Sequence, residues 1–144
     1  RWSSWGGGSK GSTSYQPKKG TLQTHTIQEM RDILMNGERL AVFSKFIGHG
    51  TQNSNKNLLL FCIDIEALRY LVDEEDVALY SRDIFNQYLK TGAKRRVLLD
   101  EALRFFLQKC FSASNSRASM FDSAQIWAFE ELGDCYQRFL SSHE

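Results

Sequence analysis

Apolar residues recur every three or four positions along most of the chain, which is the spacing of one face of an α-helix. The clearest stripe runs from Phe121 to Leu140, and Gly133 within it allows a bend. No stretch alternates apolar and polar residues as a strand does, and no proline follows Thr21. The sequence therefore predicts an all-α domain, with further helices at about 27–36, 40–47, 57–72, 77–89 and 100–110.

One of these helices is predicted to occupy the centre of the domain. The segment 57–72 carries apolar residues on more than one face, as a helix surrounded by others does. The two helices that follow have clear start signals. Asp73–Asp76 places four acids at the positive end of one helix dipole, and Asp100 is placed to cap the next.

Composition changes sharply after the first twenty residues. Residues 1–20 are rich in Gly, Ser and Lys and read as a flexible leader or linker, in which Trp2 and Trp5 either dock on a neighbour or stay in a disordered tail. Residues 21–144 then form one domain. The leader carries four basic side chains and no acid, which leaves 14 basic and 17 acidic side chains, a net charge of −3, for the rest. This balance argues against nucleic-acid binding, and no apolar run is long enough to span a membrane.

The residues that usually carry catalysis or bind metals are scattered. No phosphate-binding, metalloprotease, paired-cysteine or nucleophile-elbow motif occurs, so we predict no catalytic residue, no metal and no cofactor. Cys62, Cys110 and Cys135 each lie in an apolar helical pattern, which favours buried, reduced thiols. The basic turn Lys94–Arg96 has two interpretations, a solvated loop or a contact with acidic lipid or a phosphorylated partner.

The C-terminal sequence FDSAQIWAFEELGDCYQRFLSS resembles the last two helices of the RGS (regulator of G-protein signalling) homology domain. The family pattern is approximately FDxAQ, a short helical spacer, then DxYxRFLxS, and here the spacer is one residue shorter near Gly133. Four more segments resemble other helices of the family in the right order, namely 40–47, 55–68, 83–89 and 97–104. The resemblance spans about Gln23 to Ser142. It implies about nine helices in two lobes, one of them built around an antiparallel four-helix bundle.

The resemblance also implies a function, because members of this family accelerate GTP hydrolysis by activated Gα subunits. They supply no acid or base but hold the Gα switch segments in the transition-state geometry. By resemblance, the Gα-binding surface lies near 36–39, 50–57 and 93–99, and at Phe121 with Asp134 and Arg138.

By resemblance, five residues of that surface are expected to contact Gα: Lys56, Asn57, Leu98, Asp134 and Arg138. Asn57, Asp134 and Arg138 match the family residues. Lys56 stands where the family has Glu, and Leu98 stands where it commonly has Asn, so a weak or selective activity is expected. Asp134 and Arg138 are also spaced to form an intrahelical ion pair.

Two functions from different classes follow from these observations. The first is a Gα-binding domain that stimulates GTP hydrolysis weakly and acts as a cytoplasmic monomer, recruited to the inner face of the plasma membrane by its partner. The alternative is a non-catalytic scaffold or adaptor domain that binds another signalling protein.

Overall fold

The structure is a computed structural model that describes residues 24–48, 53–113 and 117–143. The predicted linker at residues 1–20 lies outside these ranges. Within them the chain is helical and contains no strand, which confirms the all-α class. The elements, in order, are α1 (Thr24–Met35), α2 (Gly37–Gly48), α3 (Asn53–Leu68), α4 (Glu74–Ile84), the π-helical η2 (Phe85–Leu89), α5 (Glu101–Ser112), the 3₁₀-helical η3 (Ala118–Phe121) and α6 (Asp122–His143).

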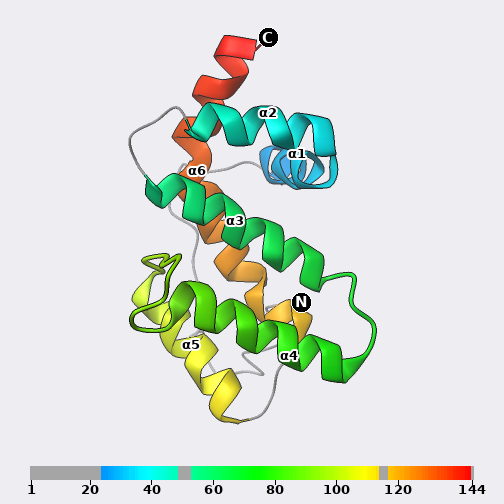
Figure 1. The fold of residues 1–144 in the computed structure, drawn as a ribbon, viewed down its shortest axis with the longest axis vertical. Coiled ribbons are helices and arrows are strands. Elements are labelled where there is room, and N and C mark those ends of the chain that lie inside the picture. The colour runs from blue at the N-terminus through cyan, green and yellow to red at the C-terminus, as the bar shows by residue number, and fades with distance from the viewer. Residues whose placement is uncertain (1–23, 49–52, 114–116, 144) are drawn as a thin grey trace.

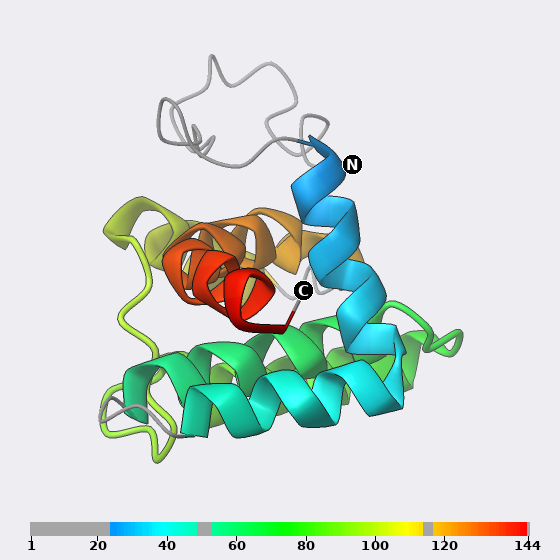
Figure 2. The same cartoon turned by 90° about the horizontal axis from the view of Figure 1, so that it is seen from above.

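The helices form two lobes that share α6 (Figure 1). The C-terminal half of α6 packs with α1 and α2, where the Phe43 ring lies 6.0 Å from that of Tyr136 and 5.0 Å from that of Phe139. The other lobe contains α3, α4, α5 and the first half of α6. There the Phe61 ring of α3 lies 5.3 Å from the ring of Tyr88. Figure 2, a view turned by 90°, shows α6 lying above α3.

The central position predicted for the third helix is confirmed. Phe61, Cys62, Ile65 and Leu68 are all fully buried, and α3 packs against α1, α2, α4 and α6. A helix that contacts neighbours on several sides needs apolar residues around most of its circumference. The predicted start signals are confirmed as well. The Asp73 carboxylate accepts a hydrogen bond from the Glu75 amide at 2.8 Å, and the Asp100 carboxylate accepts one from the Ala102 amide at 3.1 Å.

Several helices begin earlier than the sequence predicts, since α1 starts at Thr24, α2 at Gly37 and α4 at Glu74 where the prediction had about 27, 40 and 77. The third helix begins at Asn53 and ends at Leu68, so the prediction of 57–72 was shifted by four residues.

The stripe from Phe121 to Leu140 belongs to one helix, α6, as its spacing predicts, although the family resemblance implied two helices. Gly133 lies buried inside α6. A glycine in a helix interior costs about 1 kcal/mol relative to alanine. The neighbouring Leu132 and Tyr136 are buried against the rest of the core, and burying two such side chains outweighs that cost.

The described residues contain six α-helices and two short helical segments, where the family resemblance implied about nine helices. In this part of the chain α6 is one continuous helix, whereas the resemblance implied two.

Candidate functional site

The first turn of α3 is joined to the segment that follows η2. The side-chain amide of Asn57 donates a hydrogen bond of 3.5 Å to the backbone carbonyl of Arg96. Both views show the start of α3 beside this segment (Figures 1 and 2). The described part of one predicted Gα-facing region, 53–57, therefore meets a second such region, 93–99, although about forty residues separate them; residues 50–52 of the first region lie outside the described residues. Lys56 is exposed next to this junction.

Backbone hydrogen bonds fix the path of the second region. The Ala93 amide donates to the Lys90 carbonyl at 3.0 Å, which closes a four-residue turn, and Gly92 takes the positive φ of 81° that this turn requires. The Arg95 amide then donates to Gln87 O at 3.1 Å and the Val97 amide donates to Tyr88 O at 2.8 Å. These bonds use the free carbonyls at the end of η2 and hold the segment against it.

Leu98 is held on the surface by its two neighbours. Val97 and Leu99 are 2% and 5% exposed, whereas Leu98 is 74% exposed. The Leu99 amide donates to the Val97 carbonyl at 2.9 Å, which closes a three-residue turn with Leu98 at its tip, so the two neighbours are buried while Leu98 points outward. The structure thus places a large apolar side chain in solvent, two residues after the Arg96 carbonyl that Asn57 bonds, at the position where the family commonly has a polar residue.

Asp134 and Arg138 lie on the exposed side of α6. The salt bridges among the described residues do not include one between them, so the predicted intrahelical ion pair is not formed. Burial raises the pKa of the neighbouring Cys135 thiol, and its interaction with Arg138 offsets part of that rise. Both charged side chains of the family motif are therefore directed away from the core and are not held by each other.

Unlike Asp134 and Arg138, most residues of the FDxAQ part of the motif are buried inside the domain. Phe121 and Gln125 are fully buried, so Phe121 is a core residue and its predicted place on the Gα-binding surface was wrong. Gln125 Nε2 donates to the carbonyl of Cys62 at 3.2 Å and to Glu66 Oε1 at 3.0 Å. Its Oε1 accepts from Arg31 Nε at 3.2 Å and Arg69 Nη2 at 3.0 Å.

This network joins three helices around Gln125 and was not predicted from the sequence. Arg69 also forms a salt bridge with Asp122 at 2.9 Å, so both polar residues of FDxAQ serve the same joint between α3 and α6. The pKa of Arg31 is lowered mainly by burial and further by the nearby Arg69 cation, while Glu66 and Asp122 oppose the shift. The only signal in the sequence was a glutamine within an otherwise apolar stripe.

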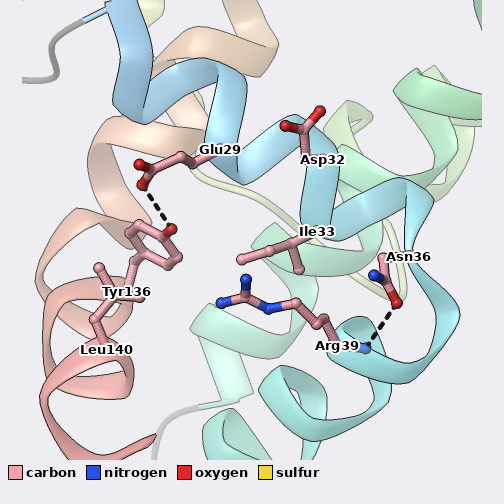
Figure 3. A pocket seen from close by; sticks show the side chains of 7 residues that line it. All are labelled: Glu29, Asp32, Ile33, Asn36, Arg39, Tyr136 and Leu140. Carbon is pink, nitrogen blue, oxygen red and sulfur yellow. Dashed lines mark hydrogen bonds between the residues drawn. The ribbon is translucent and has the colours of Figure 1, made fainter. Parts of the chain in front are cut away.

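The remaining predicted region, 36–39, borders a pocket of about 320 Å³ between α1, α2 and α6. The Asn36 side chain caps α2 by accepting from the amides of Glu38 and Arg39, at 3.1 and 3.2 Å. Figure 3 shows the Arg39 guanidinium pointing into this pocket, toward the Tyr136 ring. Tyr136 donates its hydroxyl hydrogen to Glu29 at 3.0 Å. The pocket mixes acids with one cation and has no arrangement that favours one class of ligand.

Thiol and metal chemistry find little support in the described part of the chain. Burial raises the pKa of Cys62 strongly, and the Glu66 carboxylate raises it further, which disfavours the reactive thiolate. Across residues 24–48, 53–113 and 117–143, no group of three or more His, Cys, Asp or Glu side chains is placed to hold a metal ion. None of the described helices is both long and apolar enough to cross a membrane.

Comparison with known protein families identifies the family of the chain. The family model described as "Regulator of G protein signaling domain" matches residues 29–143, which is most of the chain and includes α2 to α6 entirely. A search of curated protein sequences gave no match.

Proposed function

Because the chain belongs to the regulator of G-protein signalling (RGS) family, we propose that its specific role is to bind an activated Gα subunit through a surface made by Lys56, Asn57, Leu98, Asp134 and Arg138. Membership of the family implies a Gα subunit as the partner and a regulatory role in G-protein signalling. The observation that carries the proposed surface is the hydrogen bond from Asn57 to the Arg96 carbonyl, since it brings the start of α3 and the Leu98 segment together.

The proposed mechanism is positioning. The domain contributes no acid or base. It holds the switch segments of Gα in the conformation of the transition state, so its binding energy lowers the barrier to GTP hydrolysis. Asn57 and Arg138 donate hydrogen bonds to the switch segments, and Asp134 accepts one. A surface of this kind works only if it is rigid, and the backbone hydrogen bonds of segment 90–99 provide that rigidity.

Two residues limit the activity in this proposal. Lys56 places a cation where the family has an acid, and an unfavourable charge at an interface can cost several kcal/mol. Leu98 is exposed but has no polar side-chain atom, so it cannot hydrogen-bond the Gα glutamine that orients the attacking water. We therefore propose GTPase stimulation that is weak or limited to a subset of Gα subunits.

These same two departures favour a second candidate, a scaffold domain that has kept the RGS fold and binds a different signalling protein. In either case we propose that residues 21–144 form the domain, that it acts as a monomer in the cytoplasm, and that it reaches the inner face of the plasma membrane only through its partner.

Binding to Gα subunits from each class, measured in three nucleotide states, tests the proposal. Each subunit is loaded with GDP, with GDP and aluminium fluoride, or with a non-hydrolysable GTP analogue. We expect tightest binding to the fluoride state of at least one class, because that state resembles the transition state. Single-turnover hydrolysis with that subunit then measures the stimulation. Binding to none of the subunits in any state would contradict the proposal and favour the scaffold.

A further inference from the structure

A second surface lies at the other end of α3. A groove of about 470 Å³ is lined by Leu71, from the turn after α3, and by Asp76, Leu79, Tyr80 and Asp83 of α4. The four α4 residues fall at positions i, i+3, i+4 and i+7, which is one face of a helix. Tyr80 is held in place because its hydroxyl donates to Asp64 at 2.9 Å. The groove is therefore formed by a defined helix face with a fixed aromatic side chain.

Leu71, Leu79 and Tyr80 are the apolar residues that line this groove, and two exposed apolar residues are next to Leu71 in the chain. Leu79 is 70% exposed, and Tyr70 and Val72, on either side of Leu71 in the chain, are 63% and 95% exposed. Exposed apolar residues are common singly, but several in adjacent positions mark a surface that binds something. The helix face thus has an apolar centre at Leu79, which is mostly exposed, and Tyr80, which is partly exposed.

The charges around this apolar centre are negative. Asp76 and Asp83 lie at its two ends, and Asp64 lies behind Tyr80. The two nearby cations are turned elsewhere. Arg82 lies over the Phe111 ring, 5.6 Å from its centroid, and Arg69 forms a salt bridge with Asp122 at 2.9 Å. Among the described residues, Asp76 and Asp83 form no salt bridge, so the groove is an apolar strip between two carboxylates that no described cation pairs with.

From this charge pattern we propose that the groove binds a basic amphipathic helix of a partner protein. Asp76 and Asp83 are seven residues apart, or about 10.5 Å along the helix axis at 1.5 Å per residue. A partner helix packed along α4 complements this face if it carries Lys or Arg at two positions seven apart, with large apolar residues at the third and fourth positions between them. The cations would face the two aspartates and steer the encounter, while the apolar residues cover Leu79 and Tyr80.

This surface is separate from the proposed Gα-binding surface. Asn57 lies in the first turn of α3, whereas Leu71 follows the end of that helix, and Figure 1 shows the two ends at opposite sides of the molecule. The domain can therefore hold a Gα subunit and a basic helix at the same time. The proposal also stands independently of Gα binding, because none of the groove residues belongs to the Gα surface.

A designed peptide provides the test. The probe has about 20 residues and repeats the pattern Lys-x-x-Leu-Leu-x-x-Lys with Ala and Gln at the other positions. The control peptide replaces every Lys by Glu and keeps the same apolar spacing. Binding is measured by calorimetry at two salt concentrations, and the contact surface is mapped from amide chemical-shift changes in ¹⁵N-labelled domain. The variants are Leu79→Ser, the pair Asp76→Asn with Asp83→Asn, and the matched control Val42→Ser, which changes an exposed apolar residue on α2.

We expect the Lys peptide to bind, the Glu peptide to bind at least about tenfold more weakly, and high salt to weaken the Lys complex. Leu79→Ser and the double Asn variant should each reduce affinity at least about tenfold, and Val42→Ser should not. Shift changes should centre on Leu79 and Tyr80. Equal binding of both peptides, no binding of either, or shifts away from α4 would overturn the proposal. Concentration-dependent dimerisation that Leu79→Ser abolishes would also overturn it, since the occupant would then be a second copy of the chain.

Discussion

Gln125 and Asn57 are both amide side chains near α3, but the structure uses them differently. Gln125 is fully buried and takes part in four hydrogen bonds that join α1, α3 and α6. Asn57 is half-buried and makes one hydrogen bond of 3.5 Å to a backbone carbonyl. A polar group whose bonds are all made inside the domain stabilises the fold. A polar group with spare bonding capacity at the surface can serve a partner.

The same contrast divides the C-terminal motif. Phe121, Gln125, Tyr136 and Phe139 are buried, whereas Asp134 and Arg138 are exposed and do not form an ion pair with each other. Residues that resemble a family pattern therefore need not share a role. Burial separates those that maintain the fold from those that can carry recognition, and this separation leads to four testable predictions.

The largest effect is expected for Gln125→Leu. Leucine has a similar size but leaves Arg31, Arg69 and Glu66 without their shared partner in a mostly buried site. Arg69 keeps its salt bridges with Glu66 and Asp122, but the loss of four hydrogen bonds in a mostly buried site should still cost about 3 kcal/mol. Thermal unfolding should show a melting temperature lower by roughly 10 °C.

The matched control for this prediction is Gln137→Leu, because Gln137 is on the same helix but exposed. It should change the free energy of unfolding by less than about 0.5 kcal/mol. Equal stability of the two variants would mean that the network around Gln125 does not hold α3 and α6 together.

The next effect concerns the exposed half of the motif. Arg138→Ala should weaken Gα binding by more than about tenfold, because a charge-assisted hydrogen bond across an interface is lost. Its melting temperature should fall by no more than a few degrees, as Arg138 lies on the surface. Affinity is measured by calorimetry with the fluoride-loaded subunit. Lys109→Ala on α5 removes another exposed cation and serves as the control, and an equal affinity for Gα in both variants would remove Arg138 from the proposed surface.

The sequence only partly predicted which polar residues are buried in the fold and which are exposed on the surface. Spacings of three and four predicted the helices, and Asp73 and Asp100 marked two of their starts. The apolar stripe from Phe121 to Leu140 predicted one helix that can bend at Gly133, whereas the family resemblance implied two helices, and the structure confirms the prediction from the stripe. The role of Gln125 was hidden, since its partners lie 56 to 94 residues away along the chain. Five candidate surface residues came from the family resemblance, and their shared role in Gα binding stays a prediction.

A smaller effect is expected at a second interior joint, where Tyr80 and Tyr88 both donate to Asp64, at 2.9 and 2.5 Å. Burial and the Asp64 carboxylate raise the pKa of Tyr80 to about 12, above its usual value near 10. The folded state therefore keeps the proton while the unfolded state loses it. The stability that the hydroxyl contributes is fully present below pH 10 and is lost as the pH rises to about 12.

Tyr80→Phe should accordingly lower the free energy of unfolding by about 1 kcal/mol at pH 7 and by less at pH 11. Urea unfolding at the two pH values measures the difference. Tyr70→Phe, at a tyrosine that is 63% exposed, should have no such effect. If Tyr80→Phe lowers the free energy of unfolding by the same amount at pH 7 and pH 11, the hydrogen bond that the Tyr80 hydroxyl donates to Asp64 does not stabilise the fold.

The smallest expected effect separates the two proposed functions most directly. Lys56 is exposed beside Asn57, so Lys56→Glu changes the charge of the proposed Gα surface without disturbing the core. If that surface is a weakened Gα-binding site, restoring the family's acid should tighten binding about threefold or more, which corresponds to roughly 0.7 kcal/mol. Lys45→Glu reverses an exposed charge on α2 and controls for the change in net charge. If the domain is instead a scaffold with its contacts elsewhere, neither variant alters Gα affinity, because position 56 then contacts no Gα subunit.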